Sequence, residues 1–244
     1  MSDEIDAPRP VLSERKKRRW LYTLFGLVVL YVLAAYIIIP MIWEDYARHH
    51  PSFDDNPRIT QTSDGHPGDP LNVSLIGTRA EIISTMQAAR WHPAAALGLT
   101  SDLKIAADTV LSRPDDEAPV SDLFLFGRKE DLAFEQPVGG SPRKRHHVRF
   151  WRTTTKDADG RPIWIGSASY DERVGLSHTT GQITHHISPD VDAERDHLFE
   201  NLKQTGRLSE EYTVDGFHEQ LEGRNGGGDR WTTDGKLKVG VIAQ

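Results

Sequence analysis

Residues 146–174, HHVRFWRTTTKDADGRPIWIGSASYDERV, decide the fold that the sequence predicts. The segments at 146–155 and 163–174 are rich in β-branched and aromatic residues, and the turn-forming stretch DADGRP separates them. This pattern is typical of two strands joined by a short turn, and strands joined in this way pair antiparallel. The stretch therefore predicts a β-hairpin.

More short strands are predicted on both sides of this hairpin. LNVSLIG, beginning at Leu71, alternates apolar and polar residues, as a strand with one buried face does. Turn residues separate the remaining candidates, which are DLFLFG (122–127), DLAFEQPV (131–138), EEYTV (210–214) and KLKVGVIA (236–243). We expect these strands to form a largely antiparallel sheet.

Two helices are predicted in the first half of this region. Thr78 with Glu81 three positions later forms a capping box before apolar residues at helical spacing. A second helix is expected over Asp102–Ser112, where Pro114 ends the pattern.

A third helix is expected after the hairpin. Ser188 is the predicted cap, Pro189 suits the first helical position, and Gly206 is the predicted stop. The fold class is therefore α+β over residues 71–244: a largely antiparallel β-sheet with about three helices packed on one side.

The N-terminal part carries one long apolar stretch, residues 20–43, without a charged residue. As a helix it would span a bilayer core of about 30 Å, so we expect a transmembrane helix. The basic run RKKRR at 15–19 precedes it and acidic residues follow it, which places the tail of residues 1–19 in the cytoplasm. A cleavable signal peptide is the alternative, but the apolar run continues past any small-residue cleavage site.

Residues 44–70 are polar, contain several prolines and lack an apolar period, which predicts a flexible linker.

The composition excludes some classes of function. The chain has no cysteine, so disulfides and thiolate chemistry are excluded. Its formal net charge is −7 although the tail is basic, so the body is acidic. Because phosphate attraction dominates nucleic-acid affinity, we expect no nucleic-acid partner.

The stretch GLSHTTGQITHHISPDVDAERD places histidines close to carboxylates. His178, one of His185 and His186, and Asp190 or Asp192 could converge on a divalent metal, since imidazole and carboxylate are common ligands. The spacing matches no established metal motif, however, and acidic residues also suit the first turn of a helix. Ordinary hydrogen-bonding histidines are the alternative.

Two further segments are candidates for a binding site. Cations after a Gly-Gly turn could hold a phosphate or carboxylate, and His147 shares a strand face with Arg149. The glycine-rich GRNGGGD could allow close approach of a ligand. The alternatives are a solvated hairpin tip and a simple turn. The candidate binding residues are Arg143, Lys144, Arg145, His147, Arg149, Asn225, Gly226 and Gly227.

Three segments together resemble a known bacterial family. FLFGRKEDLAFEQPVGGSPRKRHHVRFWR, IWIGSASYDERVGLSHTTGQITHHISPDVDAERD and GRNGGGD are similar to the LssY-type C-terminal domain, whose name comes from a type I secretion locus. The resemblance covers roughly residues 71–243. In larger relatives this domain follows membrane segments that resemble DedA and lipid-phosphatase proteins, but this chain has no matching phosphatase motif. The resemblance therefore carries over no catalytic residue.

Two functions are compatible with these observations. The first is a non-enzymatic binding or accessory module of the bacterial envelope or of a transport system. Residues 20–43 would anchor it in the inner membrane, the domain would be periplasmic, and an envelope or secretion-system protein would be its partner. The alternative is a metal- or His-dependent hydrolase that acts on an envelope phosphate or ester, with the metal lowering the pKa of a bound water.

Overall fold

The computed structural model describes residues 14–94, 122–139, 141–179 and 183–243. The helix expected over Asp102–Ser112 lies outside these residues. The chain divides into two compact units, Met1–His50 and Pro51–Gln244.

The described part of the first unit is almost entirely helical, and none of its side chains is buried. It consists of α1 (Glu14–Leu33), the π-helical segment η1 (Ala34–Ile38) and α2 (Ile39–His49). The π-helical segment ends just before Pro40, whose nitrogen has no hydrogen to donate into the helix. Within the described part of the chain, Glu14–His49 is the one helix long and apolar enough to cross a membrane. It extends beyond both ends of the expected stretch 20–43.

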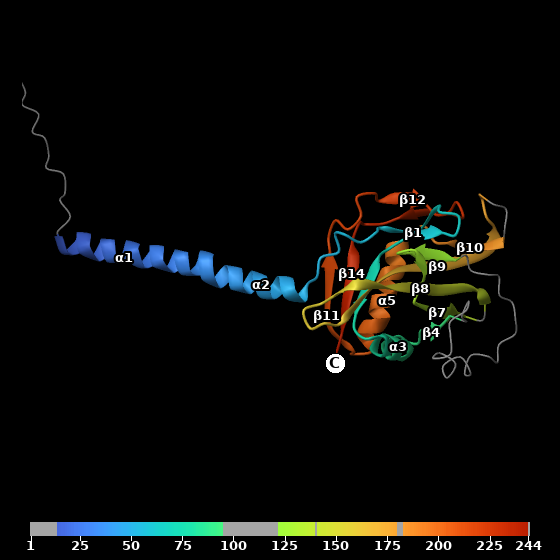
Figure 1. Cartoon of the computed structure of the whole chain (residues 1–244), viewed down its shortest axis with the longest axis horizontal. Helices are drawn as coiled ribbons and strands as arrows, with labels where there is room; N and C mark the ends of the chain where they lie inside the picture. The colour runs from blue at the N-terminus through green and yellow to red at the C-terminus, as the bar shows by residue number, and fades with distance from the viewer. Residues whose placement is uncertain (1–13, 95–121, 140, 180–182, 244) are drawn as a thin grey trace, which may run out of the picture. The chain divides into compact units, whose positions relative to one another are not determined.

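The second unit combines two long central strands and several short strands with two described helices (Figure 1). Its helices are α3 (Arg79–Ala88) and α5 (Val191–Gln204). Its strands are β1 (Ile59–Thr62), β2 (Pro67–Pro70), β3 (Val73–Ile76), β4 (His92–Pro93), β5 (Leu123–Leu125), β6 (Arg128–Lys129), β7 (Leu132–Val138), β8 (Ser141–Lys156), β9 (Pro162–Leu176), β10 (Ile183–Ile187), β11 (Leu208–Val214), β12 (Glu222–Arg224), β13 (Arg230–Thr232) and β14 (Leu237–Ile242).

The main sheet has the strand order β11-β14-β3-β9-β8-β7-β4, and β10 pairs with β9. Its pairs are antiparallel except that β14 runs parallel to β3. The expected hairpin at 146–174 is confirmed as the central pair β8–β9, and DADGRP forms its turn, with Asp157 accepting from the N–H of Gly160. The α+β class with a largely antiparallel sheet is confirmed.

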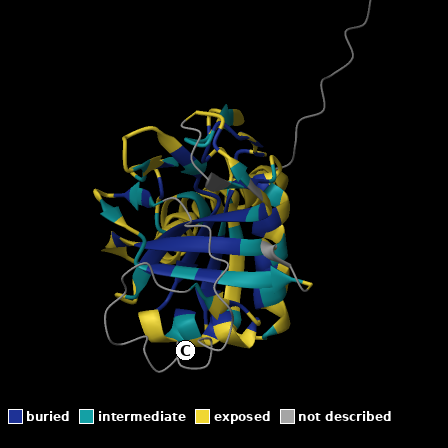
Figure 2. Ribbon diagram, turned by 90° about the vertical axis from the view of Figure 1, so that its right-hand side faces the viewer, coloured by how far each residue is buried: buried dark blue, intermediate teal, exposed yellow. Residues whose placement is uncertain are grey.

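The two faces of the main sheet are covered differently. On one face, apolar residues of α3 and α5 pack against the strands, and this core includes Met86, Phe150 and Phe199. On the other face, a core that includes Trp151 and Ile165 contains Leu123 of the small sheet β2-β1-β5-β6. In Figure 2 the middle of the sheet is dark blue because both faces are covered.

The expected linker at 44–70 differs from the structure. Residues 44–49 are helical, and β1 and β2 form an antiparallel pair inside this range. Phe53 is buried in the second core, and the side chain of Thr60 is buried and donates to the carbonyl of Asp69. Short strands that contain proline carry little apolar periodicity, so the sequence pattern did not show them.

Helix α5 begins two residues later than expected. Its cap is Asp190 rather than Ser188, because the Asp190 carboxylate accepts from the backbone N–H groups of Asp192 and Ala193. The predicted stop is confirmed at Gly206, which follows the last turn with a φ of 65°.

Candidate functional site

Three ligand-type side chains meet at one end of the second unit. His178, His186 and Asp229 each offer one atom, and these atoms lie within 4.8 Å of one another. Nδ1 of His186 lies 2.7 Å from Oδ1 of Asp229, and Nε2 of His178 lies 4.0 Å from the same oxygen. The structure therefore brings together two of the expected metal ligands and adds a carboxylate that we did not predict as one.

The three residues come from two loops and one strand. His178 lies in the turn after β9, His186 lies on β10, and Asp229 ends the loop between β12 and β13. The loops are fastened to each other by backbone contacts, since the N–H of His178 donates to the carbonyl of Gly227 at 2.9 Å. The hydroxyl of Thr179 donates to the carbonyl of Gly226 at 2.5 Å.

Burial differs among the three side chains. His186 and Asp229 are buried, whereas the side chain of His178 is 59% exposed. Oδ2 of Asp229 and Nε2 of His186 are buried without a hydrogen-bond partner among the described residues. The group therefore has one member at the surface and two fixed in the interior.

The other expected metal ligands lie elsewhere. Nε2 of His185 lies 3.3 Å from Nη2 of Arg145, away from the group. Burial, and then the charge of Arg145, lower the pKa of His185 to about 4, so its imidazole is neutral at neutral pH. Asp190 is occupied as the cap of α5.

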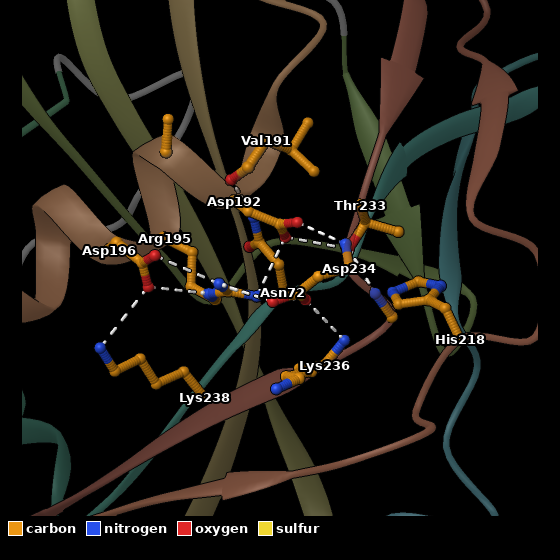
Figure 3. A network of polar contacts seen from close by, with 12 residues as sticks. Asn72, Val191, Asp192, Arg195, Asp196, His218, Thr233, Asp234, Lys236 and Lys238 are labelled. Carbon is orange, nitrogen blue, oxygen red and sulfur yellow. Dashed lines mark hydrogen bonds and ion pairs between the residues drawn. The ribbon is translucent and has the colours of Figure 1, made fainter.

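Asp192 belongs to a polar network between α5 and the loop before β14 (Figure 3). Its carboxylate accepts from Arg195 at 3.0 Å and from the hydroxyl of Thr233 at 2.9 Å. Arg195 also donates to Asp196 and Asp234, and Lys238 lies 3.5 Å from Asp196. These contacts hold the first turns of α5 in place, so Asp192 has a structural role here.

His147 and the cations near it on β8 were expected on an open binding face, but the structure buries His147 and Arg149. His147 is 7% exposed and Arg149 is 5% exposed. Lys144 is exposed, and the side chain of Arg143 lies outside the described part of the structure. Alternation along the strand predicted the shared face correctly but gave no sign that the small sheet and the β12–β13 loop cover it.

Carboxylates of this chain balance the buried cations. Arg145 donates to Glu135 at 2.9 Å and to Asp171 at 3.1 Å. Burial raises the pKa of Asp69, while the hydrogen bond from Asn225 and the charge of Arg149 oppose that shift. Arg145, Arg149 and these carboxylates thus form a buried polar row, which their opposite charges hold together.

His147 completes the row as a neutral side chain. Burial, and then the charges of Arg149 and Arg145, hold the pKa of His147 well below its usual value. Nε of Arg149 donates to Nε2 of His147 at 3.4 Å, as a neutral imidazole allows.

The glycine-rich loop is fixed against neighbouring elements. Asn225 donates to Asp69 at 3.0 Å and accepts from the N–H of Asp229 at 3.0 Å. A Cβ on Gly226 would lie 2.4 Å from Cγ2 of Thr62, so glycine permits close packing on β1. Asn225, Gly226 and Gly227 therefore position the loop that carries Asp229.

A second polar cluster on the helix-covered face was not predicted. Nδ1 of His146 lies 2.7 Å from Oε2 of Glu194 on α5, and the rings of His146 and His197 stack with centroids 3.9 Å apart. His197 in turn contacts Gln136 at 2.9 Å. Glu194 lies 48 residues from His146 in the sequence, and no local pattern connects the two.

Comparison with known proteins gives one match. The family described as the LssY C-terminus matches residues 53–237, which is most of the chain and nearly all of the second unit. No curated protein and no solved structure gives a significant match. The match begins close to the buried Phe53, in agreement with a domain that includes β1 and β2. The chain belongs to the LssY C-terminus family.

Proposed function

We propose that this protein is a single-pass accessory module of the bacterial inner membrane, whose second unit binds an envelope component or a transport-system protein in the periplasm. The observation that carries this proposal is the apolar helix Glu14–His49, whose large apolar side chains are exposed and which is followed directly by a compact unit. An exposed apolar surface of this length requires a nonpolar environment. The interior of a membrane is such an environment, and a helix inserted in it would hold the following domain at the membrane surface.

The flanking charges set the proposed orientation. The run Arg15–Arg19 lies in the first turns of the helix, and Glu44 and Asp45 lie near its other end. Arg48 is paired with Glu44 at 2.5 Å, so the second flank carries little net positive charge. Cytoplasmic flanks are the more basic ones, which favours a cytoplasmic N-terminus.

Topology is tested with the full chain in bacterial cells. We expect the protein to stay in the membrane fraction after alkaline extraction, and a C-terminal alkaline phosphatase fusion to be active. Replacing Arg15–Arg19 by glutamine and Glu44 and Asp45 by lysine should lower that activity, because it reverses the charge difference. A wild-type C-terminus reached only by cytosolic probes would contradict the orientation. A shortened, freely soluble product would identify a signal sequence instead.

The buried charged side chains are paired within the domain, so a partner protein would contact the exposed side chains instead. Of the cations first considered on β8, Lys144 is exposed, while Arg145 and Arg149 are committed to contacts within the domain. We therefore propose the end of β8 that carries Lys144 as the contact region. Lys144 is the exposed cation among the candidate residues of β8 whose side chains the structure describes.

A cross-linking experiment tests this contact region. Treatment of cells with an amine-reactive cross-linker should give a discrete adduct that Lys144→Ala loses and Lys156→Ala retains. Both lysines are exposed and lie at opposite ends of β8, so the pair is a matched control. Equal adducts from both variants would exclude Lys144 as the contact.

A further inference from the structure

We propose that His178, His186 and Asp229 form a divalent-metal site of the zinc type, which ties the turn after β9 to the loop between β12 and β13. The inference concerns metal binding and does not depend on the membrane orientation or on a partner. Its evidence lies in the donor set, the buried carboxylate and the way both loops are held.

The donor set fits zinc better than calcium or magnesium. Two imidazole nitrogens and one carboxylate oxygen are ligands of Zn²⁺ and similar transition metals, whereas Ca²⁺ and Mg²⁺ prefer oxygen alone. Three protein ligands also leave a fourth position for water in tetrahedral geometry. The charge of the Asp229 carboxylate offsets part of the ion's charge, and the two imidazoles bind in their neutral form.

The distances require only a small movement. Tetrahedral ligands at about 2.0–2.1 Å from zinc stand roughly 3.3 Å from one another. The separation between His186 Nδ1 and Asp229 Oδ1 is 2.7 Å, and that between His178 Nε2 and Asp229 Oδ1 is 4.0 Å. The two values lie on either side of the required one. Because the His178 side chain is exposed, its imidazole can turn toward the other two without disturbing the core.

The buried carboxylate is an independent indication of a cation. Asp229 is 9% exposed, and its Oδ2 has no hydrogen-bond donor among the described residues. Leaving a buried, charged oxygen without a partner is costly, and a bound cation removes that cost. Oδ1 already faces Nδ1 of His186, so the carboxylate is directed into the group.

The backbone holds the three residues together before any ion binds. The N–H of His178 donates to Gly227, and the N–H of Asn225 donates to Asp229 across the loop. A Cβ on Gly228, whose φ is 88°, would lie 2.8 Å from Cβ of His178. Glycine is thus needed there both for the backbone conformation and for the approach of His178. This preorganisation reduces the entropy lost on metal binding.

The test uses the full chain purified in detergent and stripped of metal. Titration with Zn²⁺ against a chromophoric chelator should reveal one tight equivalent, and X-ray absorption should show imidazole ligands on the bound ion. His178→Ala should weaken that equivalent by at least about tenfold, because a ligand is lost. His66→Ala removes another exposed histidine, in the turn between β1 and β2, and should leave the affinity unchanged.

Two results would overturn the proposal. One is the lack of a stoichiometric tight site in the wild-type chain. The other is equal affinity in His178→Ala and the wild type, which would assign the ion to other histidines. In both cases the contact between His186 and Asp229 would be a hydrogen bond without a metal function. Since His178 is exposed, the variant is expected to fold, and circular dichroism checks this.

Discussion

Nδ1 of His146 lies 2.7 Å from Oε2 of Glu194, and this contact joins the central strand β8 to the first turn of α5. Burial, and then the charge of Asp171, raise the pKa of Glu194 to about 9. Burial lowers the pKa of His146. Both shifts describe a neutral pair, in which the protonated carboxyl group donates to the imidazole nitrogen.

The raised pKa of Glu194 predicts that the contribution of this residue to stability falls as the pH rises. The carboxyl group ionises near pH 4.5 in an unfolded chain, so between about pH 4.5 and 9 the folded protein retains a proton that the unfolded chain has released. The contribution of Glu194 to the free energy of unfolding is complete below its pKa in the unfolded chain. It is lost as the pH approaches its pKa in the folded protein. For this one proton, the free energy of unfolding falls by at most about 1.4 kcal/mol per pH unit.

Replacing Glu194 by glutamine should remove this dependence. Between about pH 7 and 8.5, the unfolding free energy of Glu194→Gln should change less with pH than that of the wild type. Glu200→Gln, at an exposed position of the same helix, should keep the wild-type slope. Urea denaturation of the full chain in detergent measures both. If Glu194→Gln keeps the wild-type slope, Glu194 is ionised in the folded protein.

Arg145→Ala should destabilise the domain strongly. Arg145 bridges Glu135 and Asp171, and the side chain of Asp171 is 3% exposed. Removing the cation leaves a buried carboxylate without its partner, which costs about 3–5 kcal/mol. Arg152→Ala, at an exposed position of the same strand, should change the unfolding free energy by no more than about 0.5 kcal/mol.

The pH dependence of this effect provides a second check. Burial raises the pKa of Asp171 to about 6, with Arg145 opposing that shift. The carboxyl group is therefore largely protonated at about pH 5, where the loss of Arg145 should cost less than at about pH 8. Equal costs at both pH values would show that the pairing with Asp171 is not the source of the destabilisation.

The sequence predicted the parts of the fold that local patterns determine. The β8–β9 hairpin follows from alternation and from the DADGRP turn, and the capping box of Thr78 and Glu81 is present at the start of α3. The parallel pairing of β14 with β3 joins segments about 165 residues apart, and no local pattern encodes such a contact. The helix predicted at 102–112 lies outside the described residues.

The candidate site was predictable only in part. His178 and His186 were named because they lie near each other in sequence, and of His185 and His186 it is His186 that joins His178. Asp229 belongs to a loop that was singled out for its glycines, but only the packing of that loop on the turn after β9 brings its carboxylate to His186. Burial of Arg149 likewise depends on strands that the sequence did not reveal.

Gly228→Ala tests whether loop packing positions the proposed metal site. The substitution keeps all three ligands but places a methyl group against Cβ of His178 and forces a positive φ on alanine. We expect Zn²⁺ affinity to fall by at least about tenfold, because His178 is pushed away from Asp229. Gly65→Ala has the same backbone strain, with a φ of 77° and nothing within 4 Å of the added carbon. It should therefore lose a similar amount of stability, about 1 kcal/mol, while Zn²⁺ affinity remains that of the wild type. Equal losses of affinity in the two variants would mean that backbone strain weakens binding without any specific contact at His178.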